Sequence, residues 1–166
     1  MSSDTTAPGT AEHPSVVVRL ARREDVPAIV RLLADDALGA TRERVETPIA
    51  QEYLHAFDEL TSQAGNALLV AEQDHEVIGC LQLTILAGLS RVGMRRAQLE
   101  GVRVSAQHRG ARIGERLVMD AIARAREAGC GLVQLTSDAT RTDARRFYER
   151  LGFTATHVGM KLSLER

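Results

Sequence analysis

Aromatic residues and lysine are the two classes of side chain that this sequence has least of. Tryptophan is absent from its 166 residues, and aromatic residues make up only 3% of them. Lys161 is the only lysine, so arginine supplies every other cationic side chain apart from histidine. A Walker-type phosphate loop needs a lysine in a glycine-rich turn, and a G-x-S-x-G hydrolase needs a serine between glycines. Neither pattern occurs, which excludes both classes of enzyme.

Metal ligands and membrane-spanning runs are missing as well. Cys80 and Cys130 lie far apart and the five histidines are scattered, so we expect no metal site. The cysteines are interpreted as small apolar residues of a reduced, cytoplasmic protein. No apolar run approaches the ~20 residues that a transmembrane helix requires. Residues 1–15 lack the basic and apolar regions of a signal peptide, and we expect a disordered tail ahead of a single domain, 16–166.

The charge balance argues against large anionic partners. The formal net charge of −1 gives no overall attraction to nucleic acid or to an anionic membrane, and we expect neither as a partner. Positive charge is concentrated locally, because six arginines and one acidic residue, Glu100, lie between Arg91 and Arg112. Nucleic-acid binding by this stretch is an alternative, but the stretch lacks aromatic residues on which bases could stack. A phosphate-bearing ligand is favoured over a merely solvated arginine-rich surface.

The hydrophobic pattern predicts a mixed α/β fold, with an antiparallel meander followed by β-α-β crossovers. Short apolar runs predict strands, and apolar residues at helical spacing, with proline near the start or glycine at the end, predict helices. Asp25 is expected to cap the first helix. In order, we expect a strand at 16–20, helices at 24–38 and 47–60, strands at 67–71, 77–85 and 98–104, a helix at 113–128, a strand at 132–135, a helix at 144–151 and a strand at 158–164.

The stretch from Val102 to Gly114 carries the clearest chemical signal. A strand runs into a glycine-bearing turn, and the turn opens a long amphipathic helix. The first N–H groups of a helix have no partner within it, and with the helix dipole they form an anion site suited to a phosphate or diphosphate. Gly110 and Gly114 permit backbone conformations and close approaches that a side chain would block.

Two motifs in this part of the chain resemble those of a known family. Residues 109–114, Arg-Gly-Ala-Arg-Ile-Gly, resemble the Q/R-x-x-G-x-G/A diphosphate loop of the GNAT superfamily of N-acetyltransferases. Residues 144–153 are similar to that family's A-x-x-F/L-Y-x-x-x-G-F segment. The resemblance covers roughly 16–164, and it implies the single-domain GNAT fold, with acetyl-CoA as co-substrate and a primary amine as acceptor.

The sequence departs from the family's pattern at two positions. Arg112 stands where the family has its middle glycine, and Arg141 stands where an asparagine is often found. The backbone N–H at position 112 is retained, so phosphate binding should survive if the backbone angles suit a non-glycine residue. Arg112 can also add a charge contact, whereas Arg141 puts any contact made by the asparagine in doubt.

The resemblance also implies roles for individual residues. Backbone N–H groups of Val102 and Val104 are expected to face the thioester carbonyl and the pantetheine arm, and Gly101 would suit a bulge that separates this strand from the next. Arg145 could reach the adenosine phosphates, although a solvated helix face is the favoured interpretation. The full set of expected cofactor-binding residues is Val102, Arg103, Val104, Arg109, Gly110, Ala111, Arg112, Ile113, Gly114 and Glu115.

The expected reaction is direct attack of a neutral amine on the thioester through a tetrahedral intermediate, with thiolate as the leaving group. The resemblance points to Tyr148 as the acid that protonates the thiolate, and the alternative is a core tyrosine on an amphipathic helix. Glu100 is the candidate base, because it lies two residues before Val102 on the strand that in relatives supplies the acetyl-binding backbone, and no other carboxylate is near; burial in a cleft would suit it to that task. The alternative for Glu100 is a structural partner of a neighbouring arginine, with water relaying the proton.

The acceptor itself is not specified by the sequence, although a small amine is favoured over a protein. Its site is expected to involve the loop at 39–46, the second helix, the loop at 86–96 and the last strand. A non-catalytic acyl-CoA-binding regulatory module is the alternative function, and a homodimer is compatible with the resemblance. Side chains considered for the acceptor site are Arg42, Arg44, Tyr53, Arg91, Arg95 and Arg96, with Glu43, Glu46 and Glu52 beside them.

Overall fold

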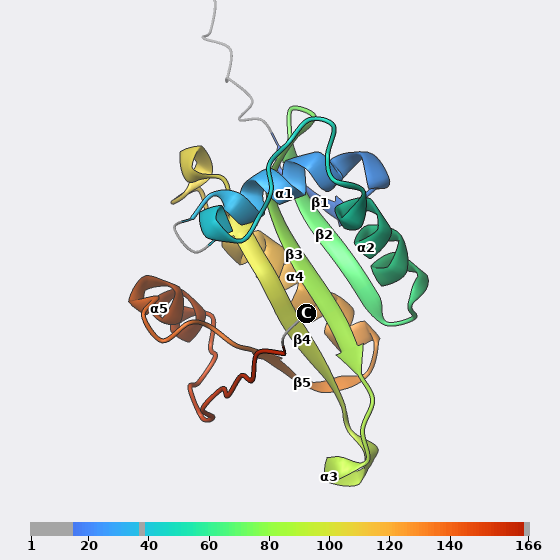
Figure 1. Cartoon of the computed structure of the whole chain (residues 1–166). Helices are drawn as coiled ribbons and strands as arrows, with labels where there is room; N and C mark the ends of the chain where they lie inside the picture. Colours follow the sequence, from blue (N-terminus) through green and yellow to red (C-terminus); the bar gives the residue numbers. More distant parts are fainter. Residues whose placement is uncertain (1–14, 37–38, 165–166) are drawn as a thin grey trace, which may run out of the picture.

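A mixed sheet organises the chain, as the pattern predicted. The computed structural model describes residues 15–36 and 39–164, so the expected tail lies outside the described residues except for Ser15. The strands lie side by side in sequence order, antiparallel up to β4, whereas β5 runs parallel to β4 (Figure 1). They are β1 (Val17–Leu20), β2 (Asn66–Gln73), β3 (Glu76–Leu86), β4 (Arg95–Val104) and β5 (Cys130–Leu135).

Helices cover both faces of this sheet. Figure 1 shows α1 (Val26–Ala34) and α2 (Gln51–Ser62) on one face and α4 (Ile113–Glu127) on the other. The predicted apolar stripe of α4 is confirmed, because Leu117, Val118 and Ala121 are fully buried against the sheet. Alternation along β2 sends Leu69 towards α4 and Val70 towards α1, so the sheet has an apolar core on each side. The remaining elements are the 3-10 turns η1 (Arg23–Asp25), η2 (Gly39–Thr41) and η3 (Ala106–His108), and the helices α3 (Ser90–Gly93) and α5 (Thr142–Arg150).

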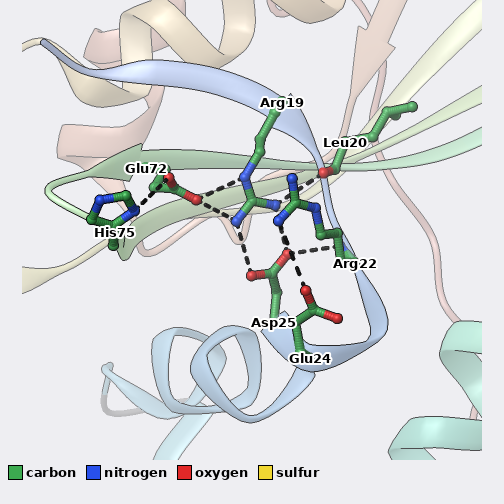
Figure 2. Close-up of polar contacts among 7 residues, drawn as sticks. All are labelled: Arg19, Leu20, Arg22, Glu24, Asp25, Glu72 and His75. Carbon is green, nitrogen blue, oxygen red and sulfur yellow. Dashed lines mark hydrogen bonds and ion pairs between the residues drawn. The ribbon is translucent and has the colours of Figure 1, made fainter.

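A charged network fastens the start of α1 to the sheet. Figure 2 shows Arg19 of β1 between the carboxylates of Asp25 and Glu72; its guanidinium donates to both Asp25 oxygens at 2.7 and 3.0 Å. Asp25 also accepts the backbone N–H of Arg22 at 2.7 Å. The carboxylate thus binds an N–H that precedes the helix and accepts none from the first turn of α1, so the prediction that its side chain caps this helix is wrong. Burial alone would raise the pKa of Asp25, but the bonds from Arg19 and Arg22 outweigh it and lower the pKa below its ordinary value.

The strand that carries the expected bulge does contain one. Cys80 pairs with Arg103 and Gln82 pairs with Glu100, so Gly101 and Val102 together face the single residue Leu81. Gly101 has φ +59°, a value that glycine adopts readily, which confirms the predicted place of the bulge. The pairing of β4 with β5 ends at Leu99, and the two strands separate from there on. The sheet is therefore open between β4 and β5 at the end of β4 that leads into the turn before α4.

Three sequence predictions about elements need correction. The expected strand at 158–164 pairs with nothing in the described structure, although its apolar side chains alternate as a strand requires. Four of them, Val158, Met160, Leu162 and Leu164, are 82–93% exposed. The loop at 86–96 is shorter than expected, since β3 extends to Leu86 and β4 begins at Arg95. The first helix ends at Ala34, and residues 37–38 lie outside the described residues.

Candidate active site

A cavity of about 930 Å³ opens where β4 and β5 separate. Its walls come from β4 after Leu99, the turn and first residues of α4, the loop after β5, and α5. The cavity brings together Tyr148, Glu100 and nine of the ten expected cofactor-binding residues; the exception is Ala111. Residues far apart in the sequence thus converge on one space whose size suits a small-molecule ligand.

The turn that opens α4 has the backbone geometry of an anion site. Gly110 has φ +88°, and Arg112, the N-cap, lies in the left-handed region at φ 60° and ψ 17°. The first intrahelical bond runs from the N–H of Arg116 to the carbonyl of Arg112. Within the described part of the chain, no protein acceptor reaches the N–H groups of Gly110 or Arg112, nor those of the first turn, Ile113 to Glu115. Ala111 differs, because its N–H is bonded to the carbonyl of His108 at 3.3 Å.

Close packing against α5 explains why position 114 is a glycine. A Cβ built there would lie 3.3 Å from the ring of Phe147 and 3.6 Å from the side chain of Val104. The absence of a side chain lets α5 come close to the first turn of α4. This contact brings the helix that carries Tyr148 against the helix that carries the free amides.

The charged residues around the cavity are mostly cationic. Arg109 is partly committed to α1, because its guanidinium donates to the carbonyl of Asp35 at 3.2 Å and approaches that residue's carboxylate at 3.4 Å. Arg112 is 81% exposed and pairs with Glu115 at 3.3 Å. The charged lining comprises seven cations (Arg42, Arg103, Arg109, Arg112, Arg141, Arg150 and Lys161) and three anions (Glu100, Glu115 and Asp138).

Tyr148 lies between two aromatic rings beside the cavity. Its ring meets Phe147 edge-on at 5.0 Å and Phe153 edge-on at 5.7 Å between centroids. No hydrogen bond to its hydroxyl is found among the described residues, and the residue is half-buried. Burial raises the pKa of Tyr148 above its ordinary value, while the positive charges of Arg141 and Arg103 act in the opposite direction. The phenol is therefore protonated at neutral pH and has two guanidinium groups near it.

Asp36, at the end of the first helical region, holds these two guanidinium groups. Its carboxylate lies 3.4 Å from Arg103 of β4 and 3.6 Å from Arg141, the N-cap of α5. It also accepts the backbone N–H of Gly39 at 2.6 Å. From the sequence, Arg141 was only a departure from the family's pattern. Its partners come from segments too distant in the sequence for any spacing to reveal them.

Glu100 lines the cavity but is exposed, so the burial expected from the sequence is not found. It lies next to the bulge, opposite Gln82 of β3. No ion pair of Glu100 is found among the described residues. The alternative role, as a structural partner of a neighbouring arginine, therefore has no contact to support it.

The expected acceptor residues are only partly brought together. Arg42 lines the cavity, whereas Arg91, Arg95 and Arg96 lie at the other end of β4 and do not. Arg44 and Tyr53 also lie outside its lining; Tyr53 bonds to Glu43 at 2.8 Å. Arg145 pairs with Glu149 at 2.8 Å and is 67% exposed, as the solvated interpretation had it. Sequence reasoning missed Arg150 and the residues 136–138 that follow β5, because the walls of this cavity form only when β4 and β5 diverge.

Residues 15–36 and 39–164 contain neither a cluster of metal ligands nor a membrane-spanning helix. No group of three or more histidine, cysteine, aspartate or glutamate side chains could hold a metal ion there. No helix in the same ranges is long and apolar enough to cross a membrane.

Comparison with known proteins places this geometry in a family. A profile of the acetyltransferase (GNAT) family matches residues 28–153, which include both sequence motifs and most of the cavity walls. The chain belongs to the GNAT family. Residues 109–114, which resemble that family's diphosphate loop, include the amides of Gly110, Arg112, Ile113 and Gly114 that bond to no acceptor in the described residues.

Several GNAT relatives have a named activity. The chain is 35% identical over 88 residues to glucosamine 6-phosphate N-acetyltransferase of Trypanosoma brucei brucei. It is 32% identical over 88 residues to aminoalkylphosphonate N-acetyltransferase of Salmonella typhimurium. Each match covers 53% of this chain and, respectively, 58% and 56% of the relative, so the chain spans little more than half of their length.

Among solved structures, the chain is similar to a Bacillus halodurans C-125 protein described as a transcriptional regulator. That similarity has a TM-score of 0.88 and 46% identity, and it covers 90% of this chain and 100% of the other. The fold is therefore shared with a protein that is described as a regulator and not as an acetyltransferase.

Proposed function

We propose that this GNAT protein transfers an acetyl group from acetyl-CoA to the primary amine of a small molecule. One observation carries the proposal: the unpartnered amides at the start of α4 border the same cavity as Tyr148. An anion bound at those amides would anchor the diphosphate end of acetyl-CoA, and its acyl arm would extend along the separated part of β4.

The residues at this cavity fit acetyl-CoA. Diphosphate oxygens would accept the N–H groups of Gly110, Arg112 and the first turn of α4, and the cationic lining would balance their charge. Ala111 is not needed, since its N–H is already bonded. At the other end, the bulge at Gly101 directs β4 away from β5 and frees backbone groups of Val102 and Val104 for the pantetheine arm and the thioester carbonyl.

Tyr148 acts in this proposal as the general acid. The amine nitrogen attacks the thioester carbon, the tetrahedral intermediate collapses, the C–S bond breaks, and the phenol gives its proton to the departing thiolate. The phenolate left behind would be stabilised by Arg141 and Arg103, which Asp36 holds in place. Arg141 thus places a positive charge near this phenolate, whereas the asparagine often found at this position in the family is uncharged.

The proton of the incoming ammonium leaves by one of two routes. Glu100 lies on the cavity wall and can accept it directly. Because Glu100 is exposed, a water molecule can equally carry the proton to bulk solvent. The carboxylate would then only attract the positively charged acceptor to the cavity. Replacement of Glu100 by glutamine separates the two routes: direct acceptance requires a loss of kcat, whereas a water relay leaves kcat nearly unchanged.

The acceptor is proposed to be an amine that also carries a phosphate or phosphonate. Two curated relatives are named for acceptors of this kind, glucosamine 6-phosphate and aminoalkylphosphonates, and a third is named for mycothiol. Arg42 and Lys161 supply cationic groups on the cavity wall that could hold such an anion. Protein acceptors are less well supported, because none of these relatives is named for one.

The test is thiol release from acetyl-CoA with paired amines. Glucosamine 6-phosphate is compared with glucosamine, and 2-aminoethylphosphonate with ethanolamine, in wild type and in Tyr148→Phe. Turnover of the phosphorylated member of each pair, reduced about 100-fold or more in Tyr148→Phe, is the expected result. Absence of turnover on any amine would overturn the enzymatic proposal, and equal rates within each pair would overturn the acceptor class.

A second candidate is a non-catalytic acyl-CoA-binding regulatory module. It is favoured by the 46% identity to the Bacillus halodurans protein described as a transcriptional regulator. This candidate requires acetyl-CoA binding without turnover on any amine and no effect of Tyr148→Phe. The same assay with a calorimetric binding measurement therefore decides between the two.

A reducing, cytoplasmic setting and self-association belong to the same proposal. Cys80 and Cys130 are both unpaired thiols, as a reducing compartment allows. Burial raises the pKa of Cys80 to about 12, so its thiol is unreactive at neutral pH. The exposed apolar row formed by Val158, Met160, Leu162 and Leu164 supports contact with a second copy of the chain.

A further inference from the structure

The only lysine of the chain lies on the wall of the proposed acetyl-transfer cavity. Lys161 belongs to the segment that follows α5, and it borders the same space as Glu100 and Tyr148. Its charge and that of Arg42 act on Asp138 from the loop after β5: hydrogen bonds from Thr140 lower the pKa of Asp138, and these two cations reinforce the effect. Lys161 thus stands among charged groups at the cavity rather than on a remote surface.

The backbone around Lys161 leaves its side chain freedom to move. Residues 158–164 form neither strand nor helix, and their side chains are exposed. The segment is nevertheless adjacent to the end of β5, since a Cβ at Gly159 would lie 3.7 Å from Thr136. A lysine side chain tethered there can sample the cavity without breaking any ladder of hydrogen bonds.

We propose that Lys161 is itself an acetyl acceptor, modified by the enzyme's own active site when no free amine is bound. This inference rests on the proposed function. The neutral ε-amine attacks the thioester carbon of acetyl-CoA, a C–N bond forms, and the C–S bond breaks. The ammonium proton passes to Glu100 or water, Tyr148 protonates the thiolate, and the products are Nε-acetyl-lysine and free CoA. No other reactant is required.

Acetylation would change the electrostatics of the acceptor side. It removes one of the cations on the cavity wall. Of the two cations that act on Asp138, Lys161 and Arg42, only Arg42 would then keep its charge. An acceptor held through a phosphate would then bind more weakly. Self-acetylation therefore lowers the enzyme's affinity for its acceptor, with an expected rise in KM of about fivefold or more for the loss of one charge-assisted bond.

The test uses the full chain incubated with acetyl-CoA in the absence of any amine. Only two kinds of primary amine are present, the ε-amine of Lys161 and the α-amine at the N-terminus, so peptide mapping by mass spectrometry assigns each acetyl group without ambiguity. Acetylation at Lys161 is expected in wild type, and it should slow at least tenfold in Tyr148→Phe and in the presence of a good amine acceptor. Lys161→Arg should gain no acetyl group at this site.

A matched control places a lysine outside the cavity. Arg145 is an exposed residue of α5 that does not line the cavity, so Arg145→Lys keeps the charge and offers a second ε-amine to solution. Acetylation of this new lysine should be at least tenfold slower than that of Lys161. Equal rates at the two lysines, or an unchanged rate at Lys161 in Tyr148→Phe, would reduce the modification to solution chemistry and overturn the inference.

The outcomes separate the inference from the proposed function. If free amines are acetylated while Lys161 stays unmodified in prolonged incubation, self-acetylation is wrong and the enzymatic function stands. If neither Lys161 nor any amine is acetylated although acetyl-CoA binds, both fail together and the regulatory module is favoured.

Discussion

Arg112 occupies a backbone conformation that is unfavourable for a residue with a side chain. At φ 60° and ψ 17° it lies in the left-handed region, which costs an L-residue about 1 kcal/mol relative to glycine. The family's glycine at this position therefore has a conformational reason. In this chain the arginine side chain is 81% exposed and pairs with Glu115, so packing adds little to the cost of the backbone angles.

Replacement of Arg112 by glycine should relieve this strain. We expect Arg112→Gly to raise the free energy of unfolding by up to about 1 kcal/mol, measured by urea denaturation. Gly110→Ala is the matched opposite: no atom lies within 4 Å of the added Cβ, but φ +88° is unfavourable for alanine, so stability should fall by about 1 kcal/mol. A destabilised Arg112→Gly would contradict the strain argument.

Arg141 should influence the pH dependence of turnover through Tyr148. A tyrosine acid must be protonated, so kcat falls as the pH rises through its pKa, and this limb should be absent in Tyr148→Phe. Arg141 lowers the pKa of Tyr148 against the effect of burial. Its removal in Arg141→Gln should therefore shift the alkaline limb to higher pH and lower kcat, whereas Arg141→Lys keeps the charge and should restore both.

Measured kcat against pH checks this prediction. An alkaline limb that stays in place in Arg141→Gln would show that the guanidinium does not act on Tyr148. Asp36 offers a further comparison, because Asp36→Asn leaves both cations present but removes the carboxylate that holds them.

Single residues were predictable where a local pattern fixes them. The turn at 109–114, with its unpartnered amides, follows from a strand, a turn and a helix start that are consecutive in the chain. Arg141, Asp36 and Lys161 were not recognised, because each acts through neighbours brought near only by the fold. The exposure of Glu100 could not be foreseen either, since it depends on how far β4 and β5 separate.

At the scale of elements, the junction between β1 and α1 depends on a charged cluster. Asp25 is 6% exposed, and its pKa is lowered by Arg19 and Arg22 in spite of burial. A carboxyl whose pKa is lower in the folded state stabilises the protein above its unfolded pKa, and this contribution is lost as the pH falls through the folded value. The cluster therefore contributes at neutral pH and disappears in acid.

Asp25→Asn should lower the free energy of unfolding at pH 7 by about 3 kcal/mol, because it leaves Arg19 with an incomplete set of partners at a buried site. The loss should shrink as the pH falls below about 4, where the unfolded chain takes up the proton, and it should vanish below the lowered pKa of Asp25 in the folded state. Asp58→Asn is the control, since its ion pair with Arg23 is half exposed and should contribute less than about 1 kcal/mol. Equal effects of the two substitutions would contradict this account.

The helices and central strands were predictable from periodicity, and the bulge from one glycine. The strand at 158–164 was predicted wrongly for a physical reason. Alternation of Val158, Met160 and Leu162 with polar residues describes which side chains share a face, but a strand exists only where a neighbouring edge pairs with it. The chain pattern contains no information on that pairing.

Across the whole molecule, the same segment carries four of the ten large apolar side chains that are exposed in the described residues. Light scattering should report a homodimer, and Leu162→Asp should convert it to a monomer, since a charge on the apolar row opposes contact with a second copy. Val92→Asp is the matched control, because Val92 is equally exposed but lies in α3, at the far end of the β3–β4 hairpin. A monomeric wild type would refute the expected self-association.

The account as a whole depends on recognition of a diphosphate by the amides at the start of α4. Calorimetric titration with acetyl-CoA and with acetyl-pantetheine, which lacks the diphosphate and the nucleotide, tests this most directly. Acetyl-CoA should bind at least 100-fold more tightly, and this difference should shrink as salt is added, as expected for an anion held by exposed cations and a helix start. Equal affinities for the two compounds, or no measurable affinity for acetyl-CoA, would contradict recognition of the diphosphate by these amides.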